Sequence, residues 1–191
     1  DKGAGSLNLT VATDAAATLK NTVTVNTLTL TQNATFNSAV TASTVSVSRG
    51  AHFKGGLTAD TQLNVTGGTL EHSVGTSALA ATSLSGGTLQ MTSGSLTHSG
   101  VFNQTGGTLQ LNGGDVTFNG RLNGTGGTVN MMGGNIAINH TGENNKLYTL
   151  DIAGSNVSTA QVSLASTAIL QVNGNMWLGN PAAIKLADDA K

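Results

Sequence analysis

The chain of 191 residues has a formal net charge of −1, contains no cysteine, and is only 9% charged and 3% aromatic. The lack of cysteine excludes disulfides and thiolate metal sites, and a charge near zero offers no electrostatic attraction to nucleic acid or an anionic membrane. No apolar run approaches the roughly 18 residues of a membrane span, so we expect no membrane insertion. Nearly half of the residues are Gly, Thr, Ser or Asn, and Val and Ile are frequent, which favours short strands separated by many turns.

The first predicted strand is LNLTV (7–11), and the following TDAAATLK (13–20) is compatible with a single helical turn. A repeat of 17 residues then begins. Its matches are TLTL (27–30) with TVSV (44–47), ATF (34–36) with AHF (51–53), and AVTA (39–42) with GLTA (56–59). Such a period indicates that one structural unit recurs along the chain.

In the middle of the chain the period lengthens. The tetrad GGTL begins at Gly67, Gly86 and Gly106 and recurs as GGTV at Gly126, with spacings of 19, 20 and 20. Further matches at a spacing of 20 pair GDVTF (114–118) with GNIAI (134–138) and LDI (150–152) with LQV (170–172). The repeat covers nearly the whole sequence, so we predict one domain over residues 1–191.

Each repeat alternates apolar and polar residues over three to five positions between Gly and Asn clusters, as in Thr108 to Leu111 followed by Asn112-Gly113-Gly114. This alternation indicates about three short, half-buried strands per repeat. The pair Asn119-Gly120 is also a hairpin signal. The fixed period favours instead an all-β fold, a single parallel β-helix (β-solenoid) of about nine to ten turns, with Gly and Asn at corners that need positive φ.

Aligning the repeats tests this prediction, because inward positions should be apolar and outward positions polar in every repeat. One column is entirely apolar and is predicted to face the interior: Leu19, Phe36, Phe53, Leu70, Leu89, Leu109, Val129, Leu150 and Leu170. The preceding outward column contains His52, Ile169 and seven threonines, which form a candidate binding ladder: Thr18, Thr35, Thr69, Thr88, Thr108, Thr128 and Thr149. A slip of one residue would invert every side chain, so this consistency supports the solenoid.

Two interpretations of the C-terminus stay open. Asn180-Pro181 resembles a helix start, which would make an Ala-rich lid, whereas Ile184-Lys185-Leu186 is typical of a last strand. Residues 180–191 would therefore either cap the last turn or dock into a neighbouring copy. Trp177 is expected to plug the end of the core.

The phrase GGTL-x-L/M with Asn/Gly turns resembles the repeats of autotransporter passenger domains and filamentous-haemagglutinin-like adhesins. The stretch KLYTLDIAGSNVSTAQVSLASTAILQVNGNMWLG (146–179) is also similar to bacterial surface β-strand-repeat proteins. The resemblance implies export, a surface or matrix location, and an adhesive or structural role.

Catalytic chemistry is not indicated. The nine carboxylates are scattered, the only arginines are Arg49 and Arg121, and His52, His72, His98 and His140 fall in different repeats without ligand spacing. His52 is predicted to be an outward ladder member. NGGD (112–115) lacks the calcium-repeat pattern, and the Gly pairs are predicted to be corners rather than phosphate cradles. We predict no catalytic, metal or cofactor site.

These observations predict a secreted, non-enzymatic structural or adhesive protein that associates with itself through the solenoid ends. The main alternative is an ice-binding protein that uses the Thr ladder, although the column beside the ladder is Lys, Asn, Glu or Gln rather than a second Thr column. A carbohydrate-binding module that recognises a surface or matrix polysaccharide is a further alternative, for which Trp177 and Tyr148 are the evident aromatic residues.

Overall fold

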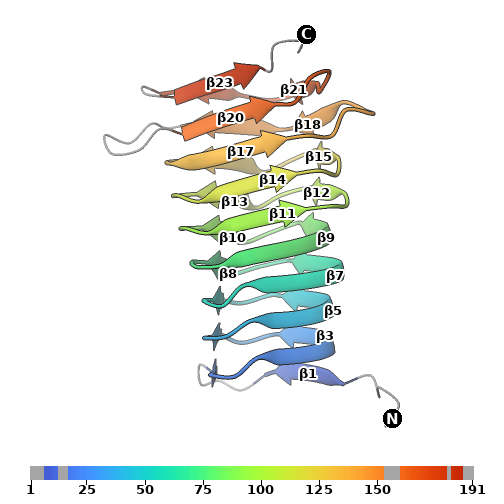
Figure 1. Ribbon diagram of the computed structural model, residues 1–191, viewed down its shortest axis with the longest axis vertical. Coiled ribbons are helices and arrows are strands. Elements are labelled where there is room, and N and C mark those ends of the chain that lie inside the picture. Colours follow the sequence, from blue (N-terminus) through green and yellow to red (C-terminus); the bar gives the residue numbers. More distant parts are fainter. Residues whose placement is uncertain (1–6, 13–16, 153–159, 180–181, 187–191) are drawn as a thin grey trace.

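The structure is a computed structural model, which describes residues 7–12, 17–152, 160–179 and 182–186. In these segments the chain forms strands and no α-helix, and every strand pair is parallel. Successive turns stack from the N-terminal end at the bottom to the C-terminal end at the top of a solenoid (Figure 1). The predicted parallel β-solenoid with three strands per turn is confirmed, and the number of turns roughly matches the nine to ten predicted.

Two sheets wrap around the core. The larger, 14-stranded sheet follows the path β1 (Asn8–Val11), β3 (Val23–Leu30), β5 (Val40–Val47), β7 (Leu57–Val65), β9 (Thr76–Leu84), β11 (Ser95–His98), β14 (Asp115–Phe118), β17 (Gly134–Ile138), β20 (Ala160–Leu164) and β23 (Ala182–Leu186). Its side branch contains β12 (Phe102–Gln104), β15 (Leu122–Gly124), β18 (Asn145–Leu147) and β21 (Leu170–Val172).

The 9-stranded sheet takes one strand from each turn: β2 (Ala17–Leu19), β4 (Ala34–Phe36), β6 (Ala51–Phe53), β8 (Thr69–His72), β10 (Thr88–Met91), β13 (Thr108–Leu111), β16 (Thr128–Met131), β19 (Thr149–Ile152) and β22 (Met176–Leu178). Among the described segments, no helix is long and apolar enough to cross a membrane.

The solenoid has three faces. The long strands β3, β5, β7 and β9 bend around one corner and so cover the first and second faces. In the turns after β9, two short strands separated by a corner replace the single long strand. β11 stacks on the first half of β9, and β12 stacks on its second half. The 9-stranded sheet is the third face. This three-sided section results from the turn clusters that interrupt each repeat.

The paired glycines form the corner between the second and third faces, where φ is positive at Gly68, Gly87, Gly107 and Gly127. A Cβ atom on Gly107 would lie 2.7 Å from the carbonyl oxygen of Gly87 in the turn below. The glycines therefore recur because the corner needs a left-handed backbone and the stacked corners leave no room for a side chain.

The predicted alternation of inward and outward residues holds along the described strands. The interior contains stacked aliphatic and aromatic side chains, and the rings of Phe36 and Phe53 are parallel with centroids 4.8 Å apart. Polar residues also enter this core, namely His72, Ser77, Thr82, His98, Gln104 and Asn145.

The predicted interior column is wrong in its register, because it joins two different columns. Phe53 of β6 pairs with His72 of β8, while Leu70 pairs with Ala51. β7 contains one extra residue, at the point where its register shifts opposite Ala42 and Thr44 of β5. The corner after β7 contains another, so β8 is displaced by two positions relative to β6. A shift of two positions keeps every residue on its own side of the sheet, so alternation could not detect it.

The last turn also differs from the prediction. Leu170 lies in β21 on the second face, where it pairs with Asn145, and Leu150 pairs instead with Met176. Gly134 pairs with Ala160, 26 positions later, so this repeat is longer than the predicted 20. The extra residues fall largely within 153–159, outside the described residues.

Four predictions concern the two ends of the chain. LNLTV contributes β1, and the strand interpretation of Ile184 and Lys185 is confirmed by β23, so the helical lid is wrong over 182–186. Residues 17–19 of the suggested N-terminal helical turn form β2, whereas 13–16 lie outside the described residues. Trp177 does not plug the core, since it pairs with Asp151 in an outward column and is 72% exposed.

Candidate functional site

The C-terminal end of the solenoid exposes its core. Met176 and Leu178 of β22 occupy inward positions but are 53% and 49% exposed, because the described chain places no further turn on them. Next to them is a hollow of about 260 Å³ lined by Leu164, Ala168, Ile169, Leu170, Val172, Met176 and Ile184. This end is an apolar surface bordered by the unpaired edges of strands.

The N-terminal end presents the opposite edge of the same interior columns. Leu19 begins the inward column that ends at Leu178, and Leu9 begins the one that ends at Leu170. Leu9, Ala17, Leu19, Val23 and Val25 are only partly buried against the core. Both ends therefore present aliphatic side chains in equivalent positions.

The structure separates the seven predicted ladder threonines into two columns. Thr69, Thr88, Thr108, Thr128 and Thr149 pair in register on five successive strands of the third face. Thr18 and Thr35 lie in a different column, which continues through His52 and Glu71. This column is displaced by two residues along the strand from that of Thr69. The two-residue shift between β6 and β8 is the reason, so the single ladder of seven is wrong and a ladder of five remains.

Beside the five threonines lies a second outward column of polar side chains. It runs through Glu71, Gln90, Gln110, Asn130 and Asp151 and ends at Trp177. The column varies in charge and length, so the third face carries one regular hydroxyl row rather than two.

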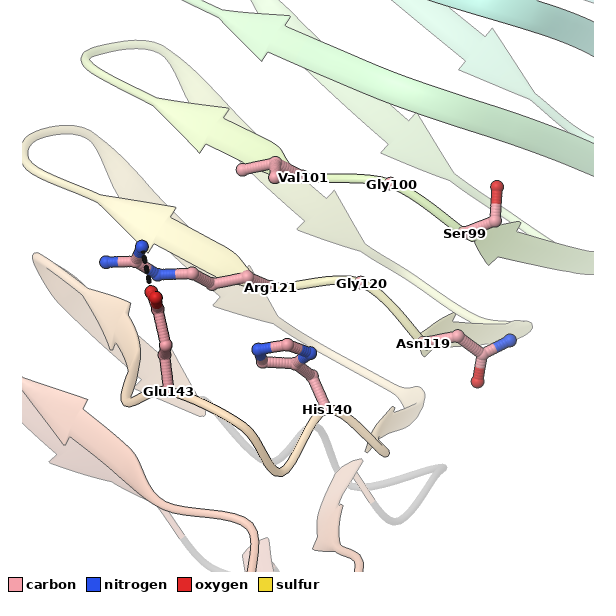
Figure 2. Close-up of a pocket in the computed structure, with 8 residues that line it drawn as sticks. All are labelled: Ser99, Gly100, Val101, Asn119, Gly120, Arg121, His140 and Glu143. Atoms are coloured by element: carbon pink, nitrogen blue, oxygen red, sulfur yellow. Dashed lines mark ion pairs between the residues drawn. The ribbon is translucent and has the colours of Figure 1, made fainter.

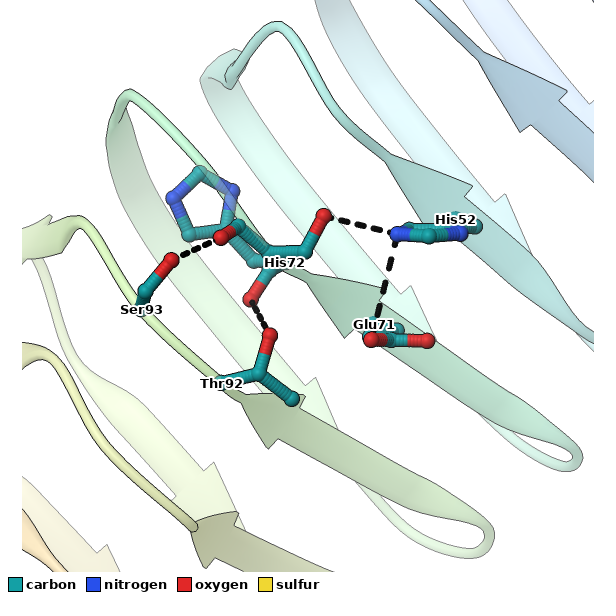
Figure 3. Close-up of polar contacts among 6 residues, drawn as sticks. His52, Glu71, His72, Thr92 and Ser93 are labelled. Atoms are coloured by element: carbon teal, nitrogen blue, oxygen red, sulfur yellow. Dashed lines mark hydrogen bonds and ion pairs between the residues drawn. The ribbon is translucent and has the colours of Figure 1, made fainter.

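Residues that are distant in the sequence meet where this shift occurs. His52 Nε2 lies 2.7 Å from Ser73 Oγ. It also lies 3.8 Å from Glu71 Oε1 (Figure 3). Thr92 Oγ1 donates to the carbonyl oxygen of His72 at 3.4 Å, and Ser93 Oγ donates to that of Ser73. His52 lies in an outward column, as predicted, but this column is that of Thr18, Thr35 and Glu71 and not the ladder of five threonines.

This cluster does not have the geometry of a nucleophilic triad. In a triad the serine and the carboxylate contact opposite nitrogens of the imidazole. Here Ser73 and Glu71 both face Nε2 of His52. Among the described residues, no group of three or more His, Asp or Glu side chains could hold a metal ion.

Two histidines lie in the core, which the sequence analysis did not anticipate. Ser77 Oγ lies 3.1 Å from His72 Nδ1 and also accepts from the backbone N–H of Leu57 at 2.8 Å, while His72 Nε2 lies 3.3 Å from the Gly75 carbonyl oxygen. A neutral imidazole protonated on Nε2 satisfies these contacts. Burial lowers the pKa of His72, and the hydrogen bond to Gly75 opposes this.

His98 is more completely enclosed. Its Nδ1 lies 3.4 Å from Thr82 Oγ1, and its Nε2 has no hydrogen-bond partner among the described residues. Burial lowers the pKa of His98 to about 3. The imidazole is therefore neutral at physiological pH and serves as an aromatic core residue.

Arg121 and Glu143, which the sequence analysis treated as scattered charges, form an ion pair. They lie on neighbouring turns at the corner between the first and second faces. Asn123 pairs with Lys146 at a spacing of 23 residues instead of 20, so the corner at 139–144 is longer than the corners before it. This added length is the feature of the sequence that accompanies the contact.

Comparison with known proteins adds no family assignment. No protein-family model matches the chain, and searches of the curated proteins and of the solved structures found no significant match.

Proposed function

We propose that this protein is a non-enzymatic extracellular structural or adhesive protein that associates with itself end to end. The observation that carries this proposal is that the same inward columns of side chains reach both ends of the solenoid. Leu178 ends a column that Leu19 begins, so the first turn of one copy can be placed on the last turn of another as a further turn.

Such a contact would use the interactions that already join the turns. β21, β22 and β23 have no strand beyond them in the described chain, and their free edge groups could pair with the first strands of a second copy. The exposed side chains of Met176 and Leu178 would be buried at the same time. Because the two ends differ, the contact is heterologous and can extend into a filament.

The low charge supports the proposal as well. A net charge of −1 gives little repulsion between approaching copies. The resemblance of the GGTL repeats to autotransporter and haemagglutinin-like adhesins supports a bacterial cell-surface or matrix location for such an assembly.

The test measures mass by light scattering and shape by electron microscopy over a range of protein concentrations. We expect the unmodified chain to form rods that lengthen with concentration. The double variant Met176→Lys/Leu178→Lys should stay monomeric, because both positions are exposed in the monomer and would carry charge into the contact. Monomeric wild-type protein at high concentration would refute end-to-end assembly.

A matched control places the same charges on the sides of the solenoid. Val74 and Met132 are 57% and 43% exposed at corners away from the ends, so Val74→Lys/Met132→Lys should assemble like the wild type. A small proportion of the Met176→Lys/Leu178→Lys variant should shorten wild-type rods, since its intact N-terminal end still docks. Wild-type rods of unchanged length would argue against a heterologous contact.

Ice binding is the second candidate, and the in-register column of five threonines is the observation that favours it. Its hydroxyls repeat at about the 4.8 Å spacing of stacked strands, which could order water along the third face. Thermal hysteresis that disappears in Thr88→Tyr/Thr108→Tyr would establish this function. We expect none in the wild type, because the neighbouring column is irregular.

A further inference from the structure

A groove crosses three successive turns at the corner between the first and second faces. It has a volume of about 460 Å³ and is lined by Ser99, Gly100 and Val101 from one turn, Asn119, Gly120 and Arg121 from the next, and His140 and Glu143 from the third (Figure 2). It lies on the side of the solenoid, apart from both ends and from the third face.

Glycines in stacked corners keep the middle of the groove free of side chains. A Cβ atom on Gly120 would lie 1.9 Å from the carbonyl oxygen of Gly100, and one on Gly100 would lie 2.5 Å from that of Ala80. Since these are backbone atoms, neither position can accept a side chain without moving the turn below. The exposed Val101 and the Arg121 side chain border this bare backbone.

The longer corner at 139–144 closes one end of the groove. It positions Glu143 against the Arg121 guanidinium, and the ion pair holds both side chains at the groove. Asn145 anchors this corner, because its side-chain amide donates to the carbonyl oxygen of His140 at 2.9 Å and accepts from the Leu122 N–H at 3.2 Å. The groove is therefore built by fixed backbone and paired charges.

Two nitrogens at the groove are buried without a hydrogen-bond partner among the described residues, namely Arg121 Nε and His140 Nε2. Buried polar groups in folded proteins are nearly always satisfied, so unpaired nitrogens beside an open groove point to a polar ligand. The charges of Arg121 and Glu143 cancel, which removes any strong selection for a charged molecule.

We infer that this groove binds a neutral oligosaccharide, with room for about two sugar units across two rungs of about 4.8 Å each. Sugar hydroxyls both donate and accept, which matches the Arg121 guanidinium and the Glu143 carboxylate. Ser99 Oγ donates to the Leu79 carbonyl oxygen, which leaves its oxygen to accept. Asn119 Oδ1 accepts from Asn139, which leaves its amide nitrogen to donate. Val101 offers an apolar contact for the C–H face of a ring. The described groove residues include no large aromatic ring, so we expect one site to bind weakly.

The test is an NMR titration of the full chain with cellobiose and with maltose, and with digalacturonate as the acidic comparison. We expect at least one neutral disaccharide to shift the backbone amides of Gly100, Gly120, Arg121 and Glu143, with weaker effects elsewhere. Arg121→Ala should weaken that binding at least tenfold. Arg49→Ala, which removes the other arginine at an exposed corner outside the groove, should leave it unchanged.

A second variant keeps the test independent of the Arg121–Glu143 ion pair. Val101→Lys changes an exposed side chain, leaves that pair in place, and should block the groove and abolish the shifts. The inference is overturned if neither neutral disaccharide shifts the groove amides, if only digalacturonate binds, or if Arg121→Ala and Val101→Lys both bind as the wild type does. End-to-end assembly is measured separately, so either result can fail without the other.

Discussion

The imidazole of His98 stacks on the ring of Phe118, with centroids 5.1 Å apart and an angle of 12° between the planes. Phe102 meets both rings edge-on, at 5.1 Å from His98 and 5.3 Å from Phe118. This cluster occupies inward positions of β11, β12 and β14. In the column of His98 and Phe118, the neighbouring turns place the aliphatic residues Leu79 and Ile138. A titratable ring therefore contributes to the core as an aromatic group, which is favourable only while it is neutral.

Acid should destabilise the protein through this residue. The pKa of His98 is about 3 in the folded protein and 6.5 when exposed, so between these values the unfolded chain binds more protons. The contribution of neutral His98 to the free energy of unfolding is fully present above pH 6.5. Below pH 6.5 it falls by up to about 1.4 kcal/mol per pH unit. The lowered pKa of His72 acts in the same direction. Urea unfolding at a series of pH values measures the slope.

The variant His98→Leu separates this effect from the carboxylates, which also titrate in acid. Between about pH 6 and pH 4 its free energy of unfolding should fall less steeply than that of the wild type, by about 1.4 kcal/mol per unit. Equal slopes for the wild type and His98→Leu would contradict the buried, neutral state of His98.

The stacked phenylalanines should dominate the stability of the N-terminal turns. Phe53 is fully buried and its ring is parallel to that of Phe36, so Phe53→Ala should lower the free energy of unfolding by about 3–5 kcal/mol. Thr108→Ala removes a half-buried outward side chain and should cost about 1 kcal/mol or less. Chemical denaturation measures both, and similar losses would mean that the inward and outward assignment is wrong.

Corner glycines should be intolerant of substitution wherever the turns stack closely. Gly107→Ala introduces a Cβ at a φ of +64°, within 2.7 Å of the Gly87 carbonyl oxygen, and should cost about 1–3 kcal/mol or more. Gly142→Ala is the control, since its Cβ would come no closer than 3.7 Å to the His140 ring. Thermal unfolding should show a clear loss for Gly107→Ala alone.

Asn145 should be required for the corner that carries Glu143. Its side chain bonds the Leu122 N–H and the carbonyl oxygens of His140 and Ile169, all from inside the core. Asn145→Leu would leave the Leu122 N–H and the His140 carbonyl oxygen unpaired, at about 1–3 kcal/mol for each. The Ile169 carbonyl oxygen would keep its bond from the backbone N–H of residue 145. The matched change Asn123→Leu affects an outward amide that donates to Asn103 at 2.8 Å, and it should cost about 1 kcal/mol. Hydrogen exchange at the Leu122 amide would show whether the corner opens.

Much of the architecture could be predicted because it depends on local patterns. Alternation of apolar and polar residues with a period of two decides which side of a strand each residue faces, and paired glycines such as Gly106-Gly107 mark a corner. Both signals operate within a few residues and recur in every repeat. The sequence by itself therefore determined the all-β class, the parallel coil and the inward or outward direction of residues such as Phe53 and Thr108.

Only the tertiary structure decided which residues lie above one another. The pairing of Phe53 with His72 depends on two added residues that leave the alternation intact, so the split of the threonines between two columns had no signal in the pattern. The contact of Arg121 with Glu143 likewise depends on how far the corner at 139–144 extends. The vertical alignment of residues depends on every insertion along the chain, whereas the pattern of one strand indicates only which side of the sheet each residue faces. The contact of His52 with Glu71 and the Arg121–Glu143 corner both lie where such insertions change the register.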